Sequence, residues 1–432
     1  MYDKKRIINR YGKPEKINQI KMFLAGEPGL HAGKKYAATK QFGISLKPEI
    51  NIMLRFFHFL SIAILFATAR GTAQDTTRID WGAPVIINNV PVIKTAAATG
   101  RHGNYGSEYV RLLHLRDGDW LAGYTVSVNK GYNVYEPYGP ASTGGLELQI
   151  SKNTDQGKHW QKISVISDPG RDLDNTQLIE TQNGSVLLAC RSVRWQESYI
   201  LRVYRSRDRG RTWSAFSVID STAGAPGALG HPDKGIYEPH MYYLDNGKLS
   251  VMYANEKHVT ENPSYSQIIS QKVSADEGKT WGKERWVAYE PGHNKSRPGM
   301  PVWTKMKNGK FMLVYEICGP EKCHVYCKTS VDGIDWPAGL GTEIPDQLGG
   351  PYVLSVTDGR LLVTSNSGNL SLSEDYGKSW KTPDRPWPKI LWGSLYQLKP
   401  DQVISASSIP RDEGGHEVGL KMGSLKSFPK SD

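Results

Sequence analysis

The 432-residue sequence predicts an all-β fold, a six-bladed β-propeller made of four-stranded antiparallel blades. Three observations carry this prediction: a composition rich in turn and aromatic residues, a short motif that recurs five times, and a hairpin pattern that precedes each copy. The chain contains 44 Gly, 12 Trp and 22 Tyr, which favours turn-rich β structure over a helical bundle.

The recurring motif is clearest in SRDRGRTW from Ser206 and SADEGKTW from Ser274. Its Ser and Asp side chains can bond nearby backbone N–H groups, Gly allows a positive φ, and Trp can pack between sheets. The motif therefore predicts a structural turn between the third and fourth strands of a blade. The five aspartates lie 43 to 68 residues apart, a period suited to one blade, and are Asp155, Asp208, Asp276, Asp332 and Asp375.

A second pattern, strand, Asp-Gly or Asn-Gly turn, strand, precedes each copy and predicts the two inner strands of a blade. It begins at Arg111, Gln177, His240, Val302 and Tyr352. A sixth unit starts at Leu391, and HEVGLKMGSL from His416 supplies its third strand. We expect APVIIN from Ala83 to add the fourth strand and close the ring, so that residues 74–432 form one catalytic domain.

The segment 53–73 is typical of a secretory signal peptide, with a basic start, an apolar run and small residues at its end. The apolar run from Phe56 to Ala69 is shorter than the roughly 20 residues of a membrane span, although a membrane anchor is the alternative. We therefore expect a secreted or periplasmic protein. We interpret residues 1–52 as an N-terminal extension that is either not native or disordered.

The basic net charge of +11 comes mostly from the segment before the expected mature chain. Thirteen of the 54 Lys and Arg, but only four of the 43 Asp and Glu, lie in residues 1–73, which leaves residues 74–432 near +2. We therefore expect no nucleic-acid partner, and no membrane association after signal cleavage.

Three of the four cysteines are close together, in the order Cys318, Cys323 and Cys327. This spacing is not a usual zinc pattern, and an exported chain favours a disulfide. Cys318 and Cys323 could close a hairpin loop, or the thiols could stay free and buried. The histidines show no metal-binding spacing, so we predict neither a metal nor another cofactor.

The predicted strand order places the motif turns on one face of the propeller and the starts of the innermost strands on the other. Polar side chains gather at those starts and at the ends of the second strands, where they would converge on the axis. Polar strand ends that only meet solvent are the alternative for any single residue. The predicted substrate-binding residues are Arg111, Asn175, Gln177, Arg191, His240, Glu256, Tyr352 and Asn366.

Glu238 and Glu316 are the predicted catalytic residues. They lie in successive blades and would face the pocket from two sides, as two carboxylates must in order to flank a glycosidic bond. Glu256 is the main rival for either role. Two loops could add sugar contacts: residues 128–145 carry Tyr132, Tyr135 and Tyr138, and residues 168–177 carry Asp172 and Asp174.

The five motifs resemble the Asp boxes, or BNR repeats, of the sialidase superfamily, and this resemblance spans most of residues 74–432. Sialidases hold a carboxylate substrate with three arginines and open their first blade with Arg-Ile-Pro. Here the first blade reads SEYVRLLHL, and the corresponding parts of blades four and five, PGMPVW and GGPYVL, contain no arginine.

The chain is more similar to the exo-1,5-α-L-arabinanase type of propeller hydrolase, whose two catalytic glutamates lie on neighbouring blades. This resemblance implies a retaining exo-glycosidase that acts on an oligosaccharide or polysaccharide of neutral, arabinan-type sugars, with Glu238 and Glu316 as its catalytic pair. The alternatives are an exo-α-sialidase and a carbohydrate-binding propeller without catalysis.

Overall fold

The computed structural model describes residues 78–88, 106–127, 145–194, 197–224, 234–290, 295–319, 322–412 and 415–426. These residues form β-strands and one short 3-10 helix, η3 (Lys257–Thr260). Within them, no helix has the length and apolar character needed to cross a membrane. The predicted signal segment, the extension before it and the tyrosine-rich loop 128–144 lie outside the described residues.

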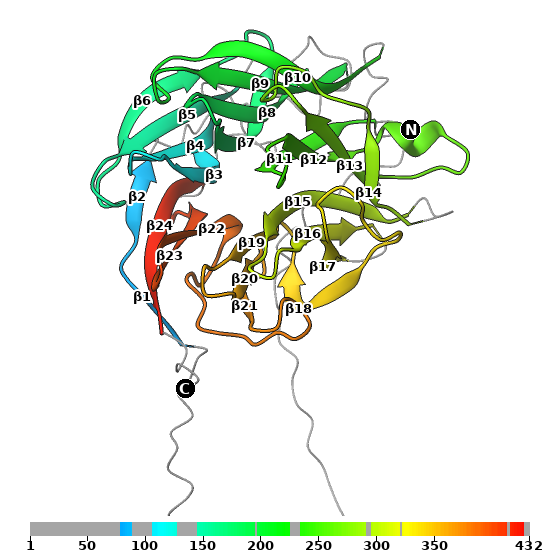
Figure 1. Cartoon of the computed structure of the whole chain (residues 1–432). Coiled ribbons are helices and arrows are strands. Elements are labelled where there is room, and N and C mark those ends of the chain that lie inside the picture. The colour runs from blue at the N-terminus through cyan, green and yellow to red at the C-terminus, as the bar shows by residue number, and fades with distance from the viewer. Residues whose placement is uncertain are drawn as a thin grey trace, which may run out of the picture. The chain divides into compact units, whose positions relative to one another are not determined.

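The strands form six antiparallel sheets around one axis (Figure 1). The first two blades are β3 (Ser107–His114), β4 (Trp120–Ser127), β5 (Leu146–Asn153) and β6 (Gln161–Ile166), then β7 (Asp172–Glu180), β8 (Val186–Arg194), β9 (Ser198–Ser206) and β10 (Ser214–Ala223). The third and fourth are β11 (Ile236–Tyr243), β12 (Leu249–Asn255), β13 (Ile268–Ser274) and β14 (Arg285–Ala288), then β15 (Arg297–Lys305), β16 (Phe311–Cys318), β17 (Lys322–Ser330) and β18 (Thr342–Leu348). The fifth blade is β19 (Tyr352–Ser355), β20 (Leu361–Thr364) and β21 (Leu370–Ser373).

The sixth blade closes the ring with strands from both ends of the described chain. It contains β22 (Leu391–Lys399), β23 (Gln402–Pro410) and β24 (His416–Leu425), and both β1 (Ile79–Trp81) and β2 (Val85–Asn88) pair with β24. In Figure 1 the blue strands β1 and β2 accordingly lie beside the red strand β24. The prediction that APVIIN closes the ring is confirmed.

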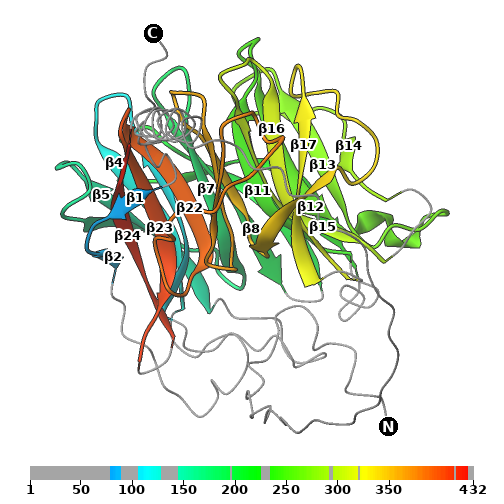
Figure 2. The same cartoon turned by 90° about the horizontal axis from the view of Figure 1, so that it is seen from below.

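The innermost strands β3, β7, β11, β15, β19 and β22 surround the axis, and each contacts the innermost strands of both neighbouring blades (Figure 1). Figure 2, turned by 90°, shows the blades side by side with their strands crossing the thickness of the ring. The predicted six-bladed propeller is therefore confirmed, and the starts of its innermost strands meet at one face.

One part of the prediction was wrong, because the fifth blade has three strands and not four. After β21 the chain makes only an isolated bridge, between Leu372 and Lys381. The next residues, 382–390, read TPDRPWPKI. Three prolines in this stretch cannot donate to a β-ladder. Trp387, in this stretch, is buried and packs on the sixth blade, with its indole N–H 3.1 Å from Oγ of Ser405 in β23.

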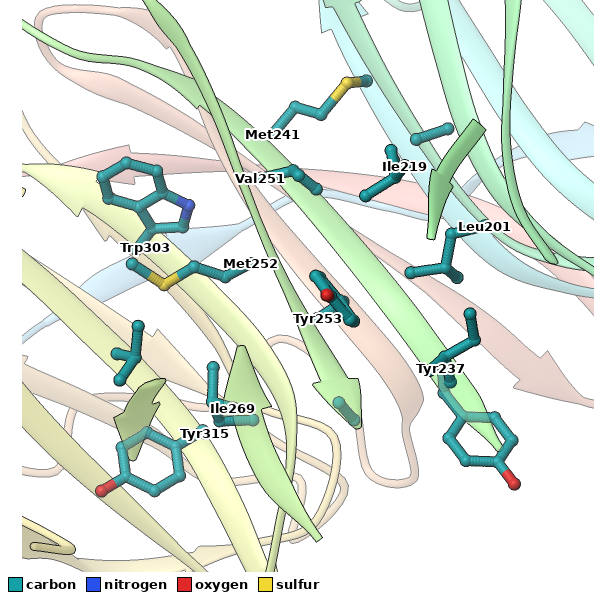
Figure 3. Packing of buried hydrophobic residues seen from close by; sticks show 14 of the residues in the cluster. Leu201, Ile219, Tyr237, Met241, Val251, Met252, Tyr253, Ile269, Trp303 and Tyr315 are labelled. Carbon is teal, nitrogen blue, oxygen red and sulfur yellow. The ribbon is translucent and has the colours of Figure 1, made fainter. Parts of the chain in front are cut away.

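The core lies between neighbouring blades, where large apolar side chains interdigitate. Its largest cluster joins blades two, three and four (Figure 3) and includes Leu201, Tyr237, Met252 and Trp303, each at most 3% exposed. Burying one large apolar side chain contributes roughly 1.5–3 kcal/mol. Contacts between blades therefore stabilise the ring and hold the innermost strands in place.

Side-chain hydrogen bonds close each motif turn. The copy from Ser274, the last residue of β13, is an example. Oγ of Ser274 donates to Asp276 at 2.8 Å and accepts the N–H of Gly278 at 2.8 Å. Asp276 also accepts the N–H and the hydroxyl of Thr280, at 2.8 and 2.6 Å. Desolvation opposes ionisation of Asp276, but the hydrogen bonds from Thr280 and Ser274 outweigh it and lower its pKa to about 2.

The same turns connect one blade to the next. The indole N–H of Trp281 is 3.3 Å from Oγ of Ser217 in the preceding blade, and Ser217 donates to the carbonyl of Gly278. Trp213 makes the equivalent contact to Ser164 at 3.1 Å. The motif is therefore a structural connector, and it lies at the opposite end of the strands from the starts of β3, β7 and β11.

We predict that Asp276→Ala lowers the free energy of unfolding by about 1–2 kcal/mol, because the bonds from Ser274 and Thr280 are lost. Hydrolytic activity should stay unchanged. Urea unfolding and steady-state kinetics measure the two effects, with Lys279→Ala in the same turn as the control. A loss of activity with unchanged stability would contradict the structural role.

Candidate active site

A β-bulge opens the innermost strand of nearly every blade at the face where these strands begin. The register shifts between Glu108 and Arg111 in β3, and at the equivalent point in β7, β11, β15 and β22. At this point in each blade, one residue takes a left-handed conformation with φ between 50° and 60°: Tyr109, Asn175, Glu238, Met300, Gly350 and Trp392. Bulges re-aim side chains, and left-handed residues other than Gly concentrate at functional sites.

At five of these six positions, the N–H of the left-handed residue bonds to a side chain. In four blades the acceptor comes from the preceding blade. Glu238 accepts from Met300 at 2.7 Å, and Glu316 accepts from Gly350 at 2.7 Å. The other two acceptors are Asn366, bonded to Trp392 at 2.6 Å, and Ser408, bonded to Tyr109 at 3.0 Å. These four polar side chains therefore connect neighbouring blades near the axis.

The two predicted catalytic carboxylates both lie next to Gly299. A β-carbon at Gly299 would be 3.5 Å from Oε2 of Glu238 and 3.5 Å from Oε1 of Glu316. The two oxygens are therefore no more than twice 3.5 Å, or 7.0 Å, apart. Carboxyl pairs of glycosidases are about 5–5.5 Å apart in retaining enzymes and about 6.5–9.5 Å apart in inverting ones. This pair is close enough to act on one bond.

Arg111, His240 and Tyr352 stand two residues after the left-handed positions and are packed together at the axis. The guanidinium of Arg111 lies 4.1 Å from the ring centre of Tyr109 and 5.4 Å from that of Tyr352, and it donates to the carbonyl of Trp392 at 3.0 Å. The His240 ring meets that of Tyr352 edge-on at 6.2 Å. Burial, with a smaller contribution from Arg111, lowers the pKa of His240 to about 3. His240 is therefore neutral.

Asp174 and Arg191 form an ion pair on the blade-two side of the site, with Nη2 of Arg191 2.8 Å from Oδ2 of Asp174. Oδ1 of Asp174 accepts from Thr125 and from the N–H of Asn175, both at 2.7 Å. Within the described part of the chain, Oδ1 of Asn175 and Nδ1 of His240 are buried without a hydrogen-bond partner. Such groups can bond a hydroxyl of a bound molecule or water.

Glu256, the predicted rival for catalysis, has a different environment. Its side chain is completely buried, accepts the N–H of Gly235 and the hydroxyl of Tyr237 at 2.9 Å each, and pairs with Arg297. Arg297 also donates to Gln267 at 3.1 Å. Glu256 is therefore a buried structural partner of Arg297, the first residue of β15.

The two remaining predicted residues connect blades. Gln177 bonds to both backbone groups of Met241 in β11, at 3.1 and 3.4 Å. Asn366 follows β20 and caps the bulge of the sixth blade, as described above. All ten predicted residues therefore lie at the axis or at the joints beside it.

Sequence reasoning gave no site role to Gly299, Met300, Gly350 and Trp392. Met300 and Gly350 stand two residues before the hairpin pattern, Gly299 stands three residues before it, and Trp392 is the second residue of the sixth unit. A left-handed conformation is not visible in residue types such as Met and Trp.

Cys318 and Cys323 form a disulfide, which realises one of the two expected alternatives, and Cys190 and Cys327 are free and buried. In the described residues, one group of three potential metal ligands comes together: Glu316, Cys318 and Cys323. The disulfide leaves no thiolate to bind a metal in this state.

Comparison with protein-family models finds no match, and no curated protein matches the sequence. Solved structures match over most of the chain. The α-L-arabinofuranosidase of Fusarium graminearum, a GH93 enzyme solved with arabinobiose, is 24% identical over 80% of this chain and 98% of its own, with a TM-score of 0.65. The α-L-arabinanase of Penicillium chrysogenum, also solved with arabinobiose, is 22% identical over 81% and 100%, with a TM-score of 0.65.

A Hadza microbial sialidase is more distant, at 13% identity over 75% of this chain and 66% of its own, with a TM-score of 0.52. The chain therefore shares the propeller fold of these proteins, and the expected sialidase-like architecture is confirmed.

We predict that the free energy of unfolding falls as the pH drops from about 6.5 towards about 3, because His240 takes up its proton in the unfolded chain but not in the fold. The slope from this one proton approaches about 1.4 kcal/mol per pH unit. His240→Gln should reduce the slope in urea unfolding, whereas His114→Gln, at an exposed site, should not. Equal slopes in all three proteins would contradict the assignment.

We predict that Gly299→Ala lowers kcat/KM by between about 10- and 100-fold. The new β-carbon would lie 2.7 Å from Nε2 of Gln267, which is bonded to the carbonyl of Pro298, and would fill space between the two glutamates. Gly82→Ala is the control, because its β-carbon meets only the carbonyl of Met422 at 3.5 Å. Unchanged kinetics in Gly299→Ala would count against a substrate position between Glu238 and Glu316.

Proposed function

We propose that the protein is an exo-acting glycoside hydrolase for neutral glycans, with arabinan-type oligosaccharides as its substrates. The observation that carries the proposal is the pair of carboxylates: oxygens of Glu238 and Glu316 lie at most 7.0 Å apart, twice their common 3.5 Å distance from the Gly299 position. The α-L-arabinofuranosidase and the α-L-arabinanase of the same fold, both solved with arabinobiose, support the choice of sugar.

The proposed reaction uses the two glutamates in turn and retains the configuration of the sugar. One carboxylic acid protonates the glycosidic oxygen while the other carboxylate attacks the anomeric carbon, and the bond to the leaving group breaks. The first glutamate then takes a proton from water, whose oxygen replaces the enzyme carboxylate. The N–H groups of Met300 and Gly350 orient the two side chains for these steps.

A neutral substrate fits the charges near the axis. Arg191 is paired with Asp174 and Arg297 with Glu256, so neither needs a substrate carboxylate. Arg360 is paired with Asp358 in the turn at the far end of β19 and β20. Arg111 has aromatic and carbonyl contacts but, among the described residues, no ion pair, and this favours an exo-α-sialidase as the second candidate.

We also propose that residues 53–73 direct export and that residues 74–432 are the mature catalytic domain. The disulfide supports export, since disulfides persist in oxidising compartments. N-terminal sequencing of the mature protein tests both statements, and a peptide from residues 1–52 in that product would refute them.

We predict that Glu238→Gln and Glu316→Gln each lower kcat on chromogenic arabinosides and arabino-oligosaccharides by about 100- to 10,000-fold. Glutamine still accepts the bulge N–H through its amide oxygen, so the fold should persist. Glu343→Gln, on the outer strand β18 of the same blade as Glu316, is the matched control.

The substrate panel also separates the alternatives. Hydrolysis of sialosides but not of arabinosides would replace the proposal with the sialidase. Binding of arabino-oligosaccharides without turnover would indicate a carbohydrate-binding propeller. Full activity in both glutamine variants would refute the assignment of the two glutamates.

A further inference from the structure

The disulfide lies against one of the two proposed catalytic carboxylates. Glu316 and Cys318 are two residues apart on β16, so their side chains point to the same face of the sheet. Sγ of Cys318 is 3.5 Å from Oε1 of Glu316, and a carboxylate oxygen and both sulfurs lie within 4.8 Å of one another. A disulfide sulfur carries no proton, so this is a packing contact and not a hydrogen bond.

The backbone holds the two cysteines together independently of the bond between their sulfurs. Cys318 pairs with Lys322 across β16 and β17, and the carbonyl of Cys323 accepts the N–H of Gly349 at 2.7 Å. Gly319 packs so tightly that a β-carbon there would be 2.1 Å from the carbonyl of Lys295. None of these contacts uses a sulfur atom, so the cysteines stay adjacent when the disulfide is reduced.

Two thiolates and a carboxylate form a ligand set that Zn²⁺ accepts. Zn–S bonds are about 2.3 Å and Zn–O bonds about 2.0–2.2 Å long, so two ligands of one ion lie at most about 4.6 Å apart. Oε1 of Glu316 and Sγ of Cys318, 3.5 Å apart, already satisfy this limit. The two sulfurs are bonded to each other in the oxidised protein, so they must move apart after reduction to bind one ion. The N–H of Gly350 on Oε2 keeps Oε1 of Glu316 towards the sulfurs, as an outer-shell hydrogen bond orients a metal-binding carboxylate.

We propose that reduction of the Cys318–Cys323 disulfide creates a binding site for one thiophilic divalent cation, such as Zn²⁺ or Cd²⁺, made of both sulfurs and the carboxylate of Glu316. A thiol reductant supplies two electrons and two protons and becomes a disulfide itself. The cation then displaces the two cysteine protons into the solvent. A bound cation occupies Glu316, so it blocks hydrolysis; this consequence alone rests on the proposed function.

The test is a spectroscopic titration of the full chain. The protein is reduced with a water-soluble phosphine, which takes up oxygen from water as the disulfide becomes two thiols, and is then desalted without air. Cd²⁺ is added, and the near-ultraviolet charge-transfer band of cadmium thiolate is followed. We expect saturation at one equivalent in the reduced protein and no band in the oxidised protein.

Three variants assign the ligands. The double variant Cys318→Ser/Cys323→Ser should lose the band. Glu316→Gln should keep it but weaken Cd²⁺ binding by at least the roughly 10- to 100-fold that loss of an outer-shell partner costs. Cys327→Ala, which removes a free buried thiol, should behave as the wild type.

Two results would overturn the proposal: no band in the reduced wild type, or an equal band in the double variant. Arabinoside hydrolysis is measured on the same samples. A cadmium band without any hydrolysis would leave the cation site standing while the proposed function fails. Hydrolysis by the oxidised protein, with no cadmium band after reduction, would support the proposed function and refute the cation site. Inhibition by one equivalent of Cd²⁺ that appears only after reduction would support both.

Discussion

The bond made by each bulge N–H at the axis is the constraint on which the rest of the site depends. A left-handed residue turns its N–H out of the ladder, and a buried N–H without an acceptor costs about 1–3 kcal/mol. Four blades meet this cost with a side chain of the preceding blade: Ser408, Glu238, Glu316 and Asn366. Neighbouring blades are therefore joined by polar contacts at the point where the innermost strands converge.

This arrangement explains why the proposed catalytic carboxylates are so well placed. Each uses one oxygen to hold a bulge, which fixes the side chain before any substrate binds. Preorganised groups need no reorientation during the reaction. In this site, the same two contacts connect blade three to blade four and blade four to blade five. The same atoms provide structural support and the proposed chemical function.

Much of the fold, and the location of Glu238 and Glu316 near each other, could be predicted, because repeated turns count the blades and orient the strands. Other features depend on contacts between distant residues. Ala254 pairs with Tyr237, at the position where Glu316 pairs with Gly299 one blade later. Alanine has no polar group, so the bulge of the fourth blade is held by Glu238 of the innermost strand. The role of Glu256 as a buried partner of Arg297 was equally invisible, since the two are 41 residues apart.

By itself, the sequence determined the propeller, its number of blades and the face on which polar residues gather, because turn chemistry and strand alternation are local properties. Only the tertiary structure decided which polar groups meet. Three prolines removed a strand from the fifth blade, and Gly299 in the fourth blade left free space next to Glu238 and Glu316. The tertiary structure also decided that Cys318 and Cys323 form a disulfide, and that this disulfide lies next to Glu316. These outcomes depend on distances between side chains from different blades, which a local pattern does not contain.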